Sequence, residues 1–188
     1  MIDPFTPGII GPIFGLSEFA LLLWKRSGGN ARSADSGSLG MLWVVILACV
    51  GVATLAAIYL PQAYSETLYH LRAVGGALCI GGLALRWYSI FYLGRFFTVN
   101  VAIASDHQVI ESGPYRFVRH PSYTGALLGF IGLGITYANW VALIIVVLPV
   151  VAAFMRRVGI EEAALSQALG ERYTGYMART KRLIPGVY

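Results

Sequence analysis

Two long segments without a charged residue constrain the fold of this chain more than any other feature. Residues 41–60 contain no Asp, Glu, Lys or Arg, and residues 126–155 are uncharged over 30 positions. A helix crosses the hydrocarbon core of a bilayer with about 20 apolar residues, because each residue adds ~1.5 Å along its axis. The first segment therefore predicts one membrane crossing, and the second is long enough for two.

The composition excludes several other classes of protein. Of the 188 residues, 57% are hydrophobic and 12% are charged, which excludes a soluble globule, since soluble domains carry about 25% charge, and also a disordered chain. The net charge is +5, but the basic residues do not form the Lys/Arg stripe of a nucleic-acid binder. Cys49 and Cys79 lie in apolar segments, so neither a disulfide framework nor a metal site is indicated. We therefore predict one all-α integral membrane domain over residues 1–188.

Two further apolar segments each carry one charge. Residues 8–24 contain Glu18 and residues 73–93 contain Arg86, and a charge at such a depth needs a partner or an exit to the headgroups. Within the uncharged segment of 30 residues, Tyr-Ala-Asn-Trp marks a turn, so we expect two short helices in a tight hairpin, the second bent at Pro149. The sequence thus predicts about five transmembrane helices, the fourth and fifth forming the hairpin.

The distribution of basic residues predicts how these helices are oriented. Basic residues gather in the first and third connections and after the fifth span, whereas the second connection and the hairpin tip have none. They are Lys25, Arg26, Arg32, Arg95, Arg116, Arg119, Arg156 and Arg157. By the positive-inside rule, these parts are cytoplasmic, which puts the N-terminus outside and the C-terminus inside and requires an odd number of helices.

Glycines recur in the third predicted span and in the first helix of the hairpin. They are Gly75, Gly76, Gly81 and Gly82, followed by Gly125, Gly129, Gly132 and Gly134. Small residues let helix backbones approach closely inside a membrane. We interpret these glycines as positions of helix packing.

Most of the polar chemistry falls in two segments, residues 94–123 and 156–188, which the predicted topology places on one side. In the first, Arg119 and His120 stand directly before Pro121, a residue that suits the first position of a helix. His120 would then lie at a helix N-terminus, where free amides and the positive dipole end favour an anionic group. This pattern predicts a carboxylate or phosphate site. The alternative is that both side chains only anchor the helix at the headgroups.

The second polar segment predicts an amphipathic cytoplasmic helix, weakened by Gly170. Its apolar positions recur at helical spacing at Leu165, Leu169, Tyr173 and Tyr176. Glu161 and Glu162 follow the predicted membrane exit at once, where a carboxylate is costly without donors such as a ribose diol or a basic side chain. The alternative is that both carboxylates belong to a solvated helix face.

Three motifs follow one another in the C-terminal half. They are Gly113-Pro114-Tyr115, then Arg119-His120-Pro121-Ser122-Tyr123 with Gly125, then Glu161-Glu162 with Leu165 and Gly170-Glu171-Arg172-Tyr173-Thr174-Gly175-Tyr176 before Arg179 and Ile184-Pro185. In order and spacing, residues 93–185 resemble the isoprenylcysteine carboxyl methyltransferases and their bacterial relatives, and phospholipid N-methyltransferases of similar fold. The apolar segments predict three N-terminal spans in residues 1–93, and the resemblance implies a cofactor-binding methyltransferase core in residues 94–188.

The resemblance also implies an activity and a site. S-adenosylmethionine would bind in a pocket that faces the cytoplasm, and a lipophilic methyl acceptor, an isoprenylcysteine-like carboxylate, would enter from the bilayer. The implied cofactor contacts are His120, Tyr123, Glu162, Tyr115 and Glu161. The implied catalytic residues, expected to orient the acceptor or shape the site, are Arg119, Arg179 and Asn100. Transfer to a carboxylate needs alignment rather than a base, whereas an amine acceptor would make His107 or His120 a candidate base.

Two other functions remain open at this point. Sterol reductases that use NADPH look similar around the Arg-His-Pro-x-Tyr motif and in residues 182–188, so a reductase of unsaturated lipids on the same scaffold is one alternative. Its cofactor carries a 2′-phosphate that Arg or Lys should meet, whereas Glu161 and Glu162 favour a free diol. The other alternative is a non-enzymatic membrane scaffold whose basic loops hold anionic lipid headgroups.

Overall fold

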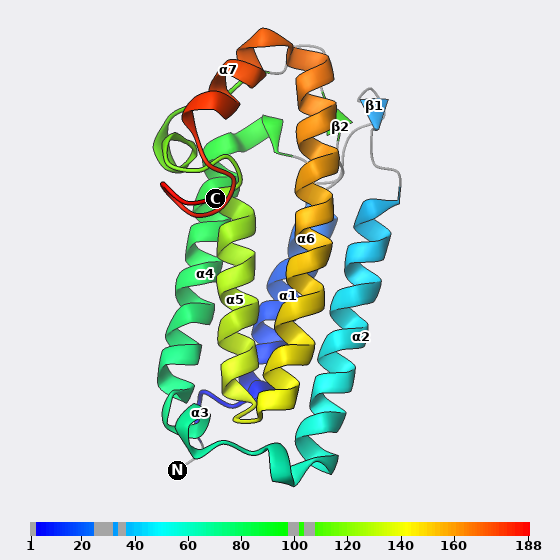
Figure 1. Ribbon diagram of the computed structural model, residues 1–188, viewed down its shortest axis with the longest axis vertical. Coiled ribbons are helices and arrows are strands. Elements are labelled where there is room, and N and C mark those ends of the chain that lie inside the picture. Colours follow the sequence, from blue (N-terminus) through cyan, green and yellow to red (C-terminus); the bar gives the residue numbers. More distant parts are fainter. Residues whose placement is uncertain (1–2, 25–31, 34–36, 98–101, 104–107) are drawn as a thin grey trace.

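The computed structural model describes residues 3–24, 32–33, 37–97, 102–103 and 108–188. Five long helices run along one axis of the molecule (Figure 1). They are α1 (Pro7–Trp24), α2 (Ser38–Tyr59), α4 (Arg72–Leu93), α5 (Pro121–Thr136) and α6 (Trp140–Leu169). The short elements are α3 (Glu66–His70), α7 (Glu171–Arg179), the 3-10 turns Pro61–Ala63, Gly94–Phe96 and Gly113–Arg116, and the antiparallel strands β1 (Arg32–Ser33) and β2 (Ala102–Ile103). The predicted all-α membrane fold is confirmed.

Helix length and composition alone give four candidate membrane crossings among the described residues rather than five. Among the described residues, four helices are long and apolar enough to span a bilayer, namely α1, α2, α4 with the turn that follows it, and α6. Helix α5 has 16 residues, about 24 Å, which is shorter than a hydrocarbon core of ~30 Å. The start of α1 and the last residues of the chain lie at opposite ends of the bundle (Figure 1), as an odd number of crossings requires. Five crossings and their sidedness stay a prediction.

The predicted hairpin is present, and its second helix is longer than expected. Asn139 starts α6, because its Oδ1 accepts a hydrogen bond from the Ala142 amide at 3.0 Å. The sequence prediction of a separate amphipathic helix after residue 155 was wrong at its start, since α6 continues without a break to Leu169. The residues beyond 155 are mostly good helix formers. Only Gly170, with φ of 56°, ends the helix and starts α7.

Helices α4 and α5 approach each other most closely, through the glycines that the sequence assigned to packing. A Cβ atom on Gly82 would overlap the backbone of α5, and one on Gly125 would lie 2.7 Å from the Arg86 amide nitrogen. The Cys79 thiol also donates a hydrogen bond to the Gly129 carbonyl at 3.1 Å. This contact fixes the backbone of Arg86 against the first turns of α5.

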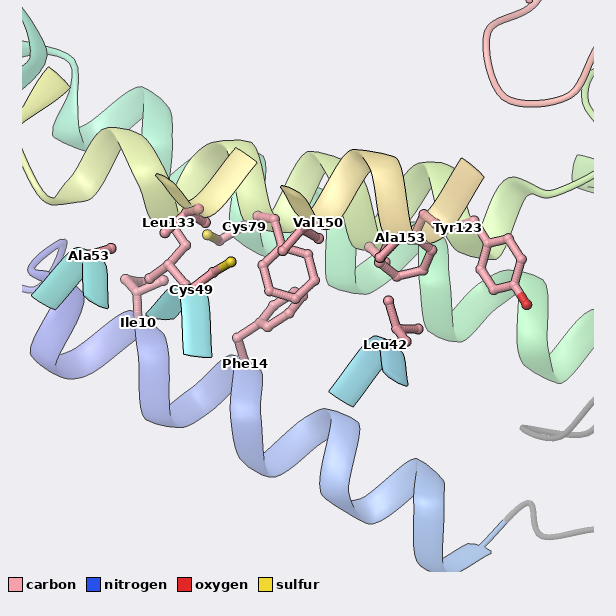
Figure 2. Packing of buried hydrophobic residues seen from close by; sticks show 14 of the residues in the cluster. Ile10, Phe14, Leu42, Cys49, Ala53, Cys79, Tyr123, Leu133, Val150 and Ala153 are labelled. Atoms are coloured by element: carbon pink, nitrogen blue, oxygen red, sulfur yellow. The ribbon is translucent and has the colours of Figure 1, made fainter. Parts of the chain in front are cut away.

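The apolar core lies between these two helices and the other three (Figure 2). Phe14 of α1 packs edge-on against Phe130 of α5, with ring centroids 4.8 Å apart. Helix α2 contributes Leu42 and Cys49 and packs along α6. Its outward face leaves large apolar side chains such as Leu47 exposed, as expected for a surface in contact with lipid.

Candidate functional site

The predicted site residues gather where the N-terminus of α5, the far part of α6 and the C-terminal segment meet, at the upper end of Figure 1. A parallel bridge pairs Val118 with Lys181. Beside it, the His120 amide donates to the Arg182 carbonyl at 3.0 Å, and the Thr124 hydroxyl donates to the Leu183 carbonyl at 2.8 Å. The last residues of the chain therefore form one wall of the site.

Glu162 is the centre of a buried ion-pair network. Its Oε1 accepts a hydrogen bond from Arg119 Nε at 2.8 Å and lies 3.2 Å from His120 Nε2. Its Oε2 accepts from Arg182 Nε at 3.0 Å, although only 4% of the Glu162 side chain is exposed. The Arg119 guanidinium also donates to the carbonyls of Met177 and Thr180. Basic side chains thus donate to this carboxylate. A basic side chain was one of the two kinds of partner that the sequence predicted for it.

Glu161, the next residue on the helix, has a different environment. The Tyr123 hydroxyl donates to Glu161 Oε2 at 2.7 Å and accepts from Arg157 Nε at 3.1 Å. The His120 and Tyr123 rings stack with centroids 5.5 Å apart and planes 9° apart. Since 29% of the Glu161 side chain is exposed, its carboxylate can also reach a bound molecule.

Two buried tyrosines form hydrogen bonds to backbone carbonyls beside the site. The Tyr115 hydroxyl donates to the Ser89 carbonyl at 3.2 Å, and the Tyr176 hydroxyl donates to the Tyr115 carbonyl at 2.6 Å. Burial raises the pKa of Tyr176 to about 12 and raises the pKa of Tyr115 strongly, the latter with help from nearby Glu161. Both phenols therefore stay neutral donors at physiological pH. The predicted cofactor contact of Tyr115 stays a prediction.

Of the predicted acceptor residues, Arg119 lies in the polar cluster that it forms with His120, Tyr123, Glu161, Glu162 and Arg182, whereas Arg179 does not. Arg179 is exposed, pairs with Glu111 at 2.7 Å, and lines an open groove on the outer side of α7 together with Gln108 and Glu171. Arg119 is committed to Glu162 and backbone carbonyls. Asn100 and His107 lie outside the described residues.

Below the polar cluster lies a small, mostly apolar pocket that the sequence did not identify as part of a site. Its volume is about 30 Å³, and α1, α2, α4, α5, α6 and Phe97 line it. The lining residues are Glu18, Leu21, Leu22, Leu39, Leu42, Trp43, Ile46, Arg86, Phe97, Tyr123, Phe154 and Arg157. Two signals could have found it: the isolated charges Glu18 and Arg86 in apolar spans, and Arg157 one helical turn before Glu161.

The fold and the site together define an integral membrane protein with a polar cluster at one end of its helix bundle and an apolar pocket directly below. A family model described as "Phospholipid methyltransferase" matches residues 71–172. The match covers more than half of the chain, which therefore belongs to this family. The resemblance to isoprenylcysteine carboxyl methyltransferases is also confirmed by individual relatives.

Among these relatives is protein-S-isoprenylcysteine O-methyltransferase B of Arabidopsis thaliana, 32% identical over 115 residues, which are 60% of this chain and 58% of the relative. The rat protein-S-isoprenylcysteine O-methyltransferase is 31% identical over 70% of this chain and 46% of its own length. A solved structure of a eukaryotic intramembrane Ras methyltransferase, isoprenylcysteine carboxyl methyltransferase, has a TM-score of 0.64 and 26% identity over 79% of this chain and 53% of that one. The chain thus spans about half the length of the proteins that it matches.

Proposed function

We propose that this protein is an S-adenosylmethionine-dependent methyltransferase that forms a methyl ester on an isoprenylcysteine-like acceptor at the membrane surface. One observation carries the proposal: Tyr123 belongs both to the polar cluster and to the apolar pocket. A water-soluble cofactor above and a lipophilic acceptor below would meet at this residue. The names of the relatives support both the reaction and the acceptor.

The residues of the polar cluster fit the cofactor. S-adenosylmethionine would supply a methyl group bound to a sulfonium sulfur. Glu161 offers a partly exposed carboxylate that can accept hydrogen bonds from the ribose hydroxyls. Glu162 was predicted to do so, but its buried oxygens already bind Arg119, His120 and Arg182. We therefore assign Glu161 to ribose binding and Glu162 to holding the wall of the site.

The side chains that line the pocket below suit the carboxylate of a lipophilic acceptor. Arg86 and Arg157 both line it, and an arginine presents a planar pair of donors that matches a carboxylate. Arg119 and Arg179, which the resemblance suggested for this purpose, do not line it. With a volume of about 30 Å³ the pocket holds no more than a few water molecules. The acceptor must therefore separate the surrounding helices when it binds, and the apolar walls then exclude water from the reacting groups.

Methyl transfer from labelled S-adenosylmethionine to vesicles tests the proposal. One set of vesicles contains a farnesylated cysteine and the other contains phosphatidylethanolamine. Base treatment releases the label as methanol from a methyl ester but not from an N-methyl group, so the two products are distinguishable. We expect base-labile label with the farnesylated cysteine. Label that resists base on the aminolipid would favour the N-methyltransferase alternative.

The reductase and the scaffold alternatives are tested by binding. We expect isothermal titration of the detergent-purified protein to show saturable binding of S-adenosylhomocysteine and none of NADPH. Binding of NADPH alone would replace the proposal by a reductase. Binding of neither compound would favour a lipid-binding scaffold.

A further inference from the structure

A buried ion pair inside the membrane joins α1 to the pocket. Glu18 of α1 accepts two hydrogen bonds from Arg86 of α4, at 2.5 Å from Nε and 2.6 Å from Nη2. The side chains are only 11% and 9% exposed. Glu18 stands six residues before the end of α1 and Arg86 seven before the end of α4, so both lie about 10 Å inside their helices.

The contacts of Arg86 fix its backbone and one edge of its guanidinium group. Gly125 holds the backbone, as described above, and Arg86 Nη1 donates to the Ser122 carbonyl at 3.2 Å, in the first turn of α5. A guanidinium group has five N–H donors. Within the described part of the chain, Glu18 and Ser122 accept hydrogen bonds from three of them, which leaves one N–H on each terminal nitrogen for another partner. These remaining donors can bind an anion.

We propose that Glu18 is the positioning residue of the acceptor site and holds Arg86 ready to bind the acceptor carboxylate. The inference rests on the proposed function and deepens it. A long cationic side chain without a partner at this depth extends toward the headgroups. The carboxylate of Glu18 prevents this, because it neutralises Arg86 and fixes the plane of the guanidinium at the level of the pocket. The acceptor site therefore includes α1, which lies outside the segment matched by the family model.

The pair that joins Asp3 to Arg72 provides a matched control. It also connects the N-terminal part of the chain to α4, at 3.3 Å, but neither residue lines the pocket. The experiment compares Glu18→Gln with Asp3→Asn. For each variant we would measure the KM and kcat for a farnesylated cysteine, the affinity for S-adenosylhomocysteine, and the Tm in detergent.

We expect Glu18→Gln to raise the KM for the acceptor about tenfold or more, the effect of one lost charge-assisted hydrogen bond. Its affinity for S-adenosylhomocysteine should stay within about twofold of the wild type, and Asp3→Asn should change neither quantity. Glu18→Asp keeps the charge but is one methylene too short for the same geometry, so its KM should also rise. This variant decides the question if Glu18→Gln does not fold.

The double variant Glu18→Arg, Arg86→Glu separates positioning from simple stabilisation. It restores an ion pair but moves the cation to α1, so we expect recovery of the Tm without recovery of the KM. Three results would overturn the inference. The first is an unchanged KM in Glu18→Gln, and the second is a lower KM in that variant, which would make Glu18 a competitor of the acceptor. The third is recovery of both the KM and the Tm in the double variant. A wild type that transfers no methyl group would instead refute the proposed function.

Discussion

Replacement of Glu162 by glutamine tests whether this residue supports the site or binds a ligand. The amide keeps the size of the carboxylate but has only one acceptor oxygen, and its NH2 group must face a basic side chain. The cheapest arrangement turns the NH2 group toward Arg182, whose side chain is 37% exposed and can move into solvent. The variant would then lose one charge-assisted hydrogen bond outright, and the bonds to Arg119 and His120 would weaken with the loss of charge.

These losses set the expected magnitude. A hydrogen bond to a charged group contributes about 1.5–3 kcal/mol, and breaking a buried ion pair costs about 3–5 kcal/mol. We therefore expect Glu162→Gln to lower the free energy of unfolding by about 3 kcal/mol. For a chain of this size that corresponds to a fall in Tm of roughly 6–12 °C.

The assay is thermal unfolding of the purified protein in detergent, combined with titration of S-adenosylhomocysteine. Glu171→Gln serves as the control, because Glu171 is exposed on α7 and its replacement should change stability by less than about 0.5 kcal/mol. Glu161→Gln should show the opposite pattern, with an unchanged Tm, since the amide oxygen still accepts from Tyr123, but an affinity about ten- to a hundredfold lower. A wild-type Tm for Glu162→Gln would refute the supporting role.

Further expectations concern packing, hydrogen bonding and topology. Gly82→Ala should destabilise the protein by about 1–3 kcal/mol, because the new methyl group meets the backbone of α5, whereas Gly81→Ala meets nothing within 4 Å and should be neutral or slightly stabilising in the same melts. Tyr176→Phe should cost about 1–3 kcal/mol, since the Tyr115 carbonyl loses its donor, without a change in the KM for the acceptor. In sealed vesicles, single cysteines at Glu66 and Ser36 should react from opposite sides; labelling from one side would contradict the five-span topology.

The sequence was sufficient for those parts of the fold that depend on one segment at a time. Uncharged lengths predicted the long helices, and the paired glycines of α4 and α5 predicted a close contact that the structure contains. The requirement that Glu18 and Arg86 find partners was also correct, although nothing in the spacing of two residues 68 positions apart showed that they would find each other. That pairing depends on how α1 is rotated against α4, which the sequence of either helix leaves open.

For the candidate site, the sequence predicted which residue types take part but not which residues pair with each other. Glu162 needed donors, but two of its three partners come from before α5 and the third from the C-terminal segment, which a parallel bridge brings into place. Hydropathy describes each residue alone and carries no such long-range pairing. The end of α6 was predicted wrongly for a different reason. The charges after residue 155 suggested a helix end, whereas the helix propensity of these residues favours continuation.

Adjacent positions on α6 give the two carboxylates different surroundings for a simple geometric reason. Consecutive helical residues point about 100° apart. Glu162 therefore faces Arg119 and the C-terminal wall, while Glu161 faces Tyr123. The Tyr123 hydroxyl, which donates to Glu161, accepts in turn from Arg157, and Arg157 donates to Ser38 at the start of α2 at 2.9 Å. One chain of hydrogen bonds thus connects α2, which borders the pocket, to the proposed ribose ligand.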